Sequence, residues 1–366
     1  MLIWCIYTGV HLVFALIVWS NTTRVKDLNG HSTEQALVSV MIPARNESDN
    51  INAAVKSVMQ QSYPNIELLV LDDHSDADTW LKLISLQWMY PKLKITQSKA
   101  LPEGWLGKNH ACHQLSTYAQ GEYLVFMDAD VRPEPGAIQG TIGRMQEEKL
   151  DFLSAFPEQT LSGKMEKQVV PFMDFFLYTF LPFILIKNTR NPAFAAANGQ
   201  WMVFKKSAYQ KIGGHEAVRK KVIEDMALAR NIKASGLKMQ LYTGLNFVKC
   251  RMYASADEVK AGFGKNAFAA AGYSAPTMLL FLTLLSVLFL LPFLLFPIYP
   301  LLMLNIAIIL GIKWKIARTL KHPIPEAVWQ HPISFIKALQ VCISSMQQYA
   351  KGTAQWKGRS MQAPKP

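Results

Sequence analysis

Apolar residues are distributed in two different patterns along the chain, as short runs in the middle and as long runs toward both ends. Between Leu37 and about Gly272, short apolar or β-branched runs alternate with helix-like segments, a pattern typical of a parallel sheet covered on both faces by helices. The segment between the first two runs places Ile51, Val55 and Val58 on one helical face. The pattern predicts an α/β domain whose first four strands are LVSVMIPA (37–44), IELLVLDD (66–73), LKITQS (93–98) and YLVFMDAD (123–130).

Outside this region, long apolar runs predict membrane segments. Residues 1–20 are almost wholly apolar and are followed by Arg24 and Lys26, so the positive-inside rule predicts a transmembrane helix that ends in the cytoplasm. A cleaved signal peptide is disfavoured, because a basic leading region and a small-residue cleavage pattern are missing. Residues 275–312 are roughly twice the ~20 residues that one crossing needs. The central FPIYP then predicts a transmembrane helical hairpin with both ends cytoplasmic.

Two further segments are apolar but interrupted by polar residues. Residues 165–187 include Asp174 and two prolines, which favours an interfacial helix, with a buried core helix weighted equally. Residues 331–350 predict an interfacial amphipathic helix in a basic cytoplasmic tail, 313–366, with a short crossing as the less favoured alternative. From Lys313 onward nine Lys or Arg stand against the single acid Glu326, as expected of a membrane-surface segment. We therefore expect a multi-pass cell-membrane protein with a cytoplasmic catalytic domain.

Composition excludes several other classes. The formal net charge is +12, but no nucleic-acid-binding signature accompanies it, so we expect no nucleic-acid partner. The four cysteines are widely spaced, which indicates neither a disulfide framework nor a zinc site. A transporter, the remote alternative, needs polar groups in its spans, and 277–312 offers only Ser286 and Asn305 besides threonines and a tyrosine.

Polar residues gather directly after three of the four predicted strands. In α/β sheets, ligands bind at the carboxyl ends of the strands. One acidic strand end is usually a turn or a helix cap, but three along one edge predict a binding site. The residues are Pro43, Ala44, Arg45, Asn46 and Glu47 after the first strand, Asp72 and Asp73 after the second, and Asp128 and Asp130 after the fourth.

The order of the motifs resembles the inverting glycosyltransferases of family 2, which have the GT-A fold, a Rossmann-like mixed sheet. The resemblance covers most of the chain, through VSVMIPARNE, LLVLDDHSD, GWLGKNHA, FMDADV, NGQW, VIEDMALA and QWKGR. GWLGKNHAC, RMY with GFGKN shortly after it, and WKGR are more narrowly similar to membrane glycosyltransferases of carotenoid and hopanoid pathways. The resemblance implies a GT-A domain over 34–272.

The resemblance also implies which residues bind the donor. Asp130, with Asp128, would hold Mg²⁺ or Mn²⁺ against the leaving diphosphate, and Asp128 would face the ribose, unless both are solvated turn acids. Asp73 would accept a hydrogen bond from the uracil imide, whereas Asp72 could cap the next helix. Lys108, near a predicted helix start, would contact the diphosphate; an exposed surface lysine is the simpler alternative. Pro43, Ala44, Arg45 and Glu47 would border the base, with Arg45 equally interpretable as a surface cation.

Acceptor chemistry follows from the later motifs. Asn198, Gly199 and Gln200 would line the sugar pocket, or merely form a turn. Asp225 would be the general base, although acids beside a helix start are common. Trp356 and Arg359 would take over part of the role of the Q-x-x-R-W motif of processive members, which we do not find, unless they belong to a solvated tail.

These assignments together predict non-processive, inverting transfer of a hexose, with glucose preferred, from a UDP-sugar to a membrane lipid. A carotenoid acid, giving a glycosyl ester, is the preferred acceptor. The alternative is a hydroxyl lipid, namely a hydroxycarotenoid, a hopanoid or a glycerolipid.

Overall fold

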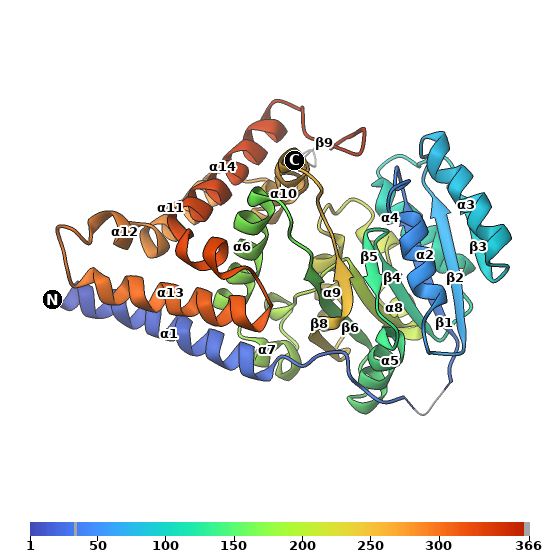
Figure 1. Cartoon of the computed structure of the whole chain (residues 1–366), viewed down its shortest axis with the longest axis horizontal. Coiled ribbons are helices and arrows are strands. Elements are labelled where there is room, and N and C mark those ends of the chain that lie inside the picture. Colours follow the sequence, from blue (N-terminus) through green and yellow to red (C-terminus); the bar gives the residue numbers. More distant parts are fainter. Residues whose placement is uncertain (33–34, 362–366) are drawn as a thin grey trace. The chain divides into compact units, whose positions relative to one another are not determined.

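The protein is described by a computed structural model that covers residues 1–32 and 35–361. Its contacts divide the chain into two compact units, whose elements are labelled in Figure 1. The helical unit comprises Met1–Arg24, Leu161–Ile184 and Tyr253–Pro366. The sheet unit comprises Val25–Thr160 and Leu185–Met252.

The sheet unit is built on one mixed sheet of eight strands in the order β3-β2-β1-β4-β7-β6-β8-β5. Strands β1 to β4 run parallel, so their carboxyl ends share one edge, and β7 pairs antiparallel with β4. The four predicted strands are confirmed, and the sheet is mixed, as in GT-A folds. The strands are β1 (Val38–Ala44), β2 (Ile66–Asp72), β3 (Leu93–Gln97), β4 (Tyr123–Met127), β5 (Val131–Pro133), β6 (Phe152–Gln159), β7 (Trp201–Lys205) and β8 (Met239–Cys250).

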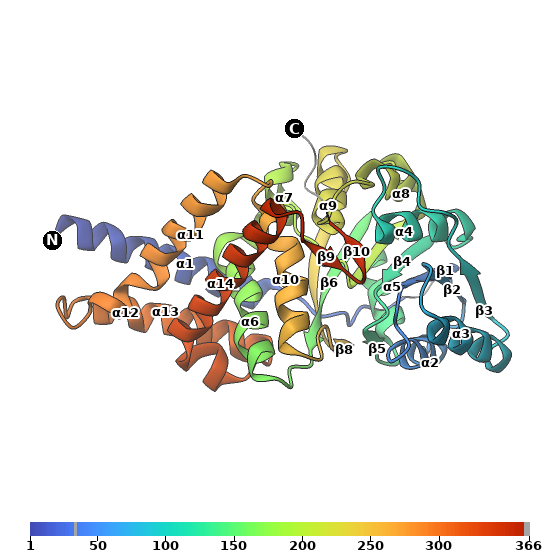
Figure 2. The same cartoon turned by 90° about the horizontal axis from the view of Figure 1, so that it is seen from above.

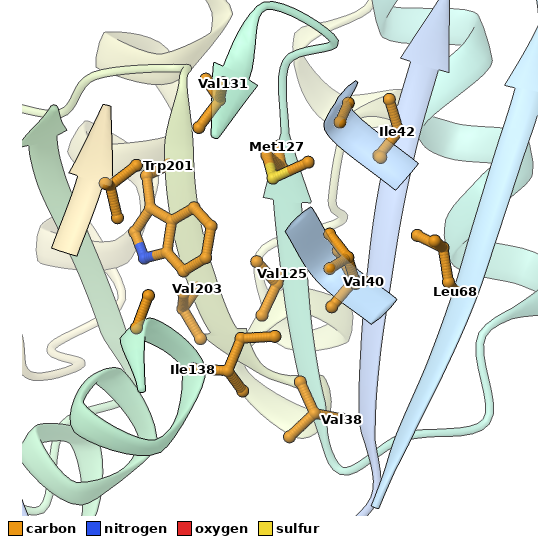
Figure 3. Packing of buried hydrophobic residues seen from close by; sticks show 14 of the residues in the cluster. Val38, Val40, Ile42, Leu68, Val125, Met127, Val131, Ile138, Trp201 and Val203 are labelled. Atoms are coloured by element: carbon orange, nitrogen blue, oxygen red, sulfur yellow. The ribbon is translucent and has the colours of Figure 1, made fainter. Parts of the chain in front are cut away.

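Alternate residues of the strands build the main core of this unit. On β1, the side chains of Val38, Val40 and Ile42 point to the face of the sheet on which Ile138 of helix α5 packs (Figure 3). Trp201 of β7 lies on the same face, between the strands and α5. Helices α2, α3 and α5 contribute to the same cluster, whereas α4 packs on β1 and β2. The helices are α2 (Ile51–Met59), α3 (Ala77–Met89), α4 (Gly107–Tyr118), α5 (Ala137–Glu147), α8 (Lys206–Lys211) and α9 (Glu224–Ala234), with short turns η1 (Pro192–Phe194) and η2 (Glu216–Val218).

The segment that leads into β1 packs its backbone directly on the backbone of α5. A Cβ on Gly140 would lie 1.9 Å from the Leu28 carbonyl oxygen, and one on Gly30 would lie 2.3 Å from the Arg144 nitrogen. Such contacts admit only glycine, which is the reason for glycines inside a helix that they would otherwise weaken.

The helical unit contains the apolar segments of the sequence. α6, α10 and α14 pack against one another (Figure 2), and α1 packs along α13 (Figure 1). On α6, Phe175 and Tyr178 are buried by these neighbours while Met173 is half exposed. The helices are α1 (Leu2–Arg24), α6 (Lys164–Phe180), α10 (Ala256–Ala270), α11 (Ala275–Phe289), α12 (Leu291–Leu295), α13 (Leu302–Thr319), the π-helical turn η3 (Pro325–Trp329) and α14 (His331–Ala350); α7 (Phe183–Asn188) leads on to the sheet unit.

Among the described residues, one helix is long and apolar enough to cross a membrane, α1. The pair α10 and α11 meets the same criterion only when taken together, and it is bent by 108°. The predicted hairpin corresponds to α11, α12 and α13, of which α11 has 15 residues and α13 carries Lys313, Lys315 and Arg318. An N-terminal apolar helix is therefore established, whereas a multi-pass arrangement stays a prediction.

Polar side chains of α1 fix it to the rest of the helical unit. Asn21 is buried, donates to the carbonyl oxygens of Tyr178 and Leu181 at 2.8 Å each, and accepts from the Phe183 amide at 2.8 Å. Thr8 and Asn305 of α13 form a second buried polar contact. α1 is thus an integral element of its unit in this structure.

Asn21→Ala should lower the thermal stability of the detergent-solubilised protein. The change leaves buried backbone groups without partners, which costs about 1–3 kcal/mol per group. Thr23→Ala is the matched control, since Thr23 is exposed and its hydroxyl bonds only to Trp19 and Ser20 of the same helix. Equal melting temperatures for the two variants, measured by differential scanning fluorimetry, would contradict the anchoring role.

Candidate active site

The ends of β1 and β2 are tied together by backbone and side-chain hydrogen bonds. The Asp73 amide donates to the Ala44 carbonyl at 2.7 Å, and the Arg45 guanidinium donates to the carbonyl oxygens of Asp73 and His74 at 2.6 and 3.1 Å. Arg45 therefore supports the loop that carries Asp73, which is 4% exposed. Asp72 accepts a long bond of 3.4 Å from the Ser75 amide, and the helix that follows is not capped by a side chain.

Nearby residues hold the start of α2 against α3. The Glu47 amide donates to the Thr79 hydroxyl at 3.1 Å, and the Glu47 carboxylate accepts from the Asn50 side chain at 2.8 Å. Pro43 lies in β1 beside Ala44, paired in register with Leu71 of β2. These contacts give Glu47 a structural partner and place it on the same edge as Asp73.

The turn after β4 carries the two aspartates and is braced by Arg132. The Val131 amide donates to the Asp128 carbonyl at 3.1 Å, which closes the turn. Arg132 donates to the carbonyl oxygens of Ala129 and Val131 at 2.8 Å each, and its other nitrogen reaches Asn50. The sequence pattern gave no reason to single out Arg132, because its partners are backbone atoms.

Lys108 joins this turn to the second acidic motif. It lies in the first turn of α4, as predicted, and its Nζ is 2.8 Å from Asp128 Oδ1 and 3.0 Å from Glu224 Oε1. Burial alone would lower the pKa of Lys108, but the carboxylates of Asp128 and Glu224 outweigh burial and hold that pKa well above its usual range. One ammonium group thus links two acids that are far apart in the sequence.

Asp225 stands beside this ion pair, at the start of α9. Its Oδ2 accepts from the Gly199 amide at 2.9 Å, and its Oδ1 accepts from the Met226 amide at 2.7 Å. Burial, together with the negative charge of Glu224, raises the pKa of Asp225 to about 7. The two hydrogen bonds and the charge of Lys108 act in the opposite direction but do not cancel this rise. A carboxyl group whose pKa lies near neutrality is suited to proton transfer.

Gly199 approaches the charged groups closely. A Cβ at this position would lie 3.3 Å from Lys108 Nζ and 3.5 Å from a carboxylate oxygen of each of Asp225 and Glu224. The predicted Asn-Gly turn is present, since the Asn198 carboxamide accepts from the Gln200 amide at 2.9 Å. The local turn is therefore present beside the acidic side chains, whereas a role of this loop in lining the sugar pocket stays a prediction.

Gln200 connects the same loop to the aspartates after β4. It is buried, and its Nε2 donates to the Cys250 sulfur at 2.9 Å. Burial raises the pKa of the Cys250 thiol well above its usual range, with the Asp130 carboxylate adding to the rise, so the thiol stays protonated and hydrogen-bonds to Asp130. The loop of residues 198–200 is thus connected to Asp225 through the Gly199 amide and to Asp130 through Gln200 and Cys250.

The predicted C-terminal residues belong to the helical unit. Gln355–Trp356 and Arg359–Ser360 form the short antiparallel ribbon of β9 and β10. The side chain of Trp356 lies outside the described part of the structure. The substrate-binding roles of Trp356 and Arg359 stay predictions.

The carboxylates fit a divalent cation that is held mainly by substrate. Within residues 1–32 and 35–361, no group of three or more His, Cys, Asp or Glu side chains is arranged to bind a metal. Mg²⁺ and similar ions bound with nucleotides need only one or two protein carboxylates, because phosphate oxygens and water complete the shell. Asp130 and Asp128, two hard oxygen donors on one tight turn, match that requirement.

Comparison with known proteins defines the class. Residues 39–213 match the family described as Glycosyl transferase family 2. These residues contain the strand ends, Lys108, both aspartates after β4 and the 198–200 loop. Residues 39–213 therefore form a glycosyltransferase family 2 domain, as the motifs predicted, and the mixed sheet has the GT-A fold.

Individual relatives are distant. The chain is 26% identical to the 4,4'-diaponeurosporenoate glycosyltransferase of Staphylococcus aureus strain MRSA252. The match covers 66% of this chain and 64% of that protein, so the chain spans less than two thirds of the relative's length. The enzyme of the same name from strain N315 is 25% identical over 72% of this chain and 69% of the relative. The fold resembles that of the mannosyltransferase PcManGT of Pyrobaculum calidifontis, solved with GDP-Man and Mn²⁺, with a TM-score of 0.60, 18% identity, and coverage of 93% and 95% of the two chains.

Lys108→Met should destabilise the protein by removing the only cation shown to pair with Glu224 in the described structure. The Glu224 side chain is 8% exposed, and breaking a buried pair costs about 3–5 kcal/mol; because Lys108 is 35% exposed, water offsets part of this cost and we expect roughly 1–2 kcal/mol. The control is Lys260→Met, which removes a surface pair with Asp257. Similar melting temperatures for the two variants would contradict the linking role of Lys108.

Proposed function

We propose that the protein transfers a hexose from a UDP-sugar to a lipid at the cytoplasmic face of the membrane, with inversion and without processive synthesis. The observation that carries the proposal is the convergence of the Asp128 turn, Lys108 and Asp225 in one unit. Glucose is the preferred sugar. The apolar helix α1 supports a membrane location.

The acceptor is inferred from the relatives. The distant similarity to 4,4'-diaponeurosporenoate glycosyltransferases supports a carotenoid acid, which would yield a glycosyl ester. A hydroxyl lipid is the second candidate, favoured by one observation: Asp225 has a raised pKa and is poised as a base, which an already ionised carboxylate does not need.

The residues would divide the work as follows. Asp73 would hold the nucleobase, while Asp130 and Asp128 would hold Mg²⁺ or Mn²⁺, which supplies positive charge to the departing diphosphate. Lys108 adds a fixed positive charge beside Asp128. With a hydroxyl acceptor, Asp225 would take the proton as the oxygen attacks C1 from the face opposite the nucleotide, so one displacement inverts the configuration.

A substrate panel tests the proposal as a whole. Purified protein in detergent is offered UDP-glucose, other UDP-hexoses and GDP-mannose, each with a carotenoid acid, a hydroxycarotenoid, a hopanoid or diacylglycerol. We expect transfer from a UDP-sugar to a lipid. Transfer from GDP-mannose alone would overturn the donor assignment, and hydrolysis without transfer to any lipid would overturn the acceptor class.

Asp130→Ala should abolish transfer, and EDTA should do the same to the unchanged protein, reversibly on addition of Mg²⁺ or Mn²⁺. The reason is that the leaving diphosphate needs a cation and Asp130 is a proposed ligand. Asp78→Ala, an exposed acid in the first turn of α3, is the control and should retain activity. Full activity in EDTA would remove the metal from the proposal.

Asp225→Asn should distinguish the two acceptors. With a hydroxyl lipid, kcat should fall by about 10²-fold or more, the scale expected for losing a general base. The unchanged enzyme should then gain activity as the pH rises through about 7, where Asp225 loses its proton, and the variant should lose this step. With a carboxylate acceptor both effects should be much smaller.

The control for this substitution is Glu216→Gln, which alters an exposed acid elsewhere in the same unit. Product chemistry gives an independent reading, because a glycosyl ester breaks in mild alkali whereas a glycoside survives. An alkali-stable product would exclude the ester while leaving glycosyl transfer intact.

A further inference from the structure

Two parallel helices of the helical unit carry a cluster of tryptophan and basic side chains at one end. The Lys315 ammonium lies 4.9 Å from the ring centroid of Trp19, and the Arg318 guanidinium lies 5.4 Å from that of Trp314. We call Trp19, Arg24, Trp314, Lys315 and Arg318 the basic indole cluster. It draws residues from α1 and from α13.

Both helices run in the same direction, which fixes the place of the cluster. Near the start of the helix pair, Thr8 of α1 contacts Asn305 of α13. Further along, Trp19 of α1 contacts Lys315 of α13, which is eleven residues later on α1 and ten residues later on α13. The N-terminus of α1 and the start of α13 therefore share one end of the helix pair, and the basic indole cluster lies toward the other. At ~1.5 Å per residue, about 16 Å of helix separates the two contacts.

Charge is distributed unevenly between these two ends. Residues 2–23 and 275–312 contain no Asp, Glu, Lys or Arg, whereas Arg24, Lys315 and Arg318 all fall at the cluster. None of these three cations forms an ion pair with an acid among the described residues. Trp19 is 63% exposed and Trp314 is 45% exposed, so large aromatic surfaces accompany uncompensated positive charge.

We propose that the basic indole cluster binds the phosphate headgroups of anionic lipids at the cytoplasmic surface of the bilayer. Indole rings favour the level of the headgroups, and cations near that level are attracted to anionic lipid. The cation–π contacts hold Lys315 and Arg318 against the rings while leaving their charges unneutralised. The apolar ends of α1 and α13 then point into the hydrocarbon layer, which explains the absence of charge there.

Lipid-dependent thermal stability tests this site. The full chain in neutral detergent is heated with phosphatidylglycerol, with phosphatidylcholine of the same acyl chains, or with inorganic phosphate. Because a ligand that binds the folded state stabilises it, phosphatidylglycerol should raise Tm by about 2 °C or more beyond phosphatidylcholine. Equal shifts from the two lipids, or the same shift from inorganic phosphate, would overturn the proposal.

Two double variants separate this site from net charge. Lys315→Gln with Arg318→Gln should abolish the difference between the two lipids. Lys56→Gln with Lys99→Gln, which removes two exposed charges from the sheet unit, should preserve it. Each variant is compared with itself without lipid, so a general loss of stability does not mimic the effect. Retention of the difference in the first variant would contradict the assignment.

A second measurement locates the contact. Bromine on the phosphatidylglycerol acyl chains close to the headgroup should quench tryptophan emission more than brominated phosphatidylcholine does. Trp19→Phe with Trp314→Phe should remove that excess, and its persistence would place the anionic lipid elsewhere. Neither measurement reads glycosyl transfer, so the lipid site and the proposed activity can fail separately.

Discussion

The compensation of several acids by one lysine is the constraint on which the site depends. Asp128 and Glu224 come from different motifs, and like charges brought together without a cation would repel. Lys108 satisfies both at about 3 Å, and its place in the first turn of α4 fixes its reach. Gly199 lies beside this lysine and Glu224, since a Cβ at its position would be 3.3 Å from Lys108 Nζ and 3.5 Å from a carboxylate oxygen of Glu224. The loop, the helix start and the strand end are thereby kept in one arrangement.

Sequence patterns predicted which residues lie at the edge of the sheet, but not the side-chain contacts that join them. Parallel strands with acidic ends identify one rim, because strand direction alone places Asp73 and Asp128 on it. The contact of Lys108 with Glu224 joins residues more than a hundred positions apart, which periodicity cannot reveal. Arg132 and Cys250 were missed for a related reason. The first bonds to backbone carbonyls, and the second is an apolar-looking residue whose thiol becomes relevant only beside Gln200 and Asp130.

Hydropathy likewise does not reveal which side chains contact the apolar helices of the helical unit. The α11 segment ends before Pro292, which has no amide hydrogen to donate to the Leu288 carbonyl. Tyr7 and His11 of α1 reach that carbonyl at 3.1 and 2.9 Å, and His331 of α14 reaches the Phe289 carbonyl at 2.9 Å. The apolar sequence of this segment does not indicate that the carbonyl oxygens at the end of α11 are hydrogen-bonded by side chains of α1 and α14.

The charge of the site bears on the two acceptors in opposite ways. The proposed carboxylate acceptor would add a negative charge beside Asp128, Asp130, Glu224 and Asp225, and its entry would depend on the positive charges of Lys108 and of the proposed metal ion. A raised pKa lessens the conflict, because Asp225 then carries a proton over much of the range below pH 7 and can donate a hydrogen bond to the acceptor. A hydroxyl acceptor needs the opposite state, an ionised Asp225. Burial beside Glu224 therefore bears on both proposed acceptors, because it sets the pH at which Asp225 changes from a hydrogen-bond donor to a proton acceptor.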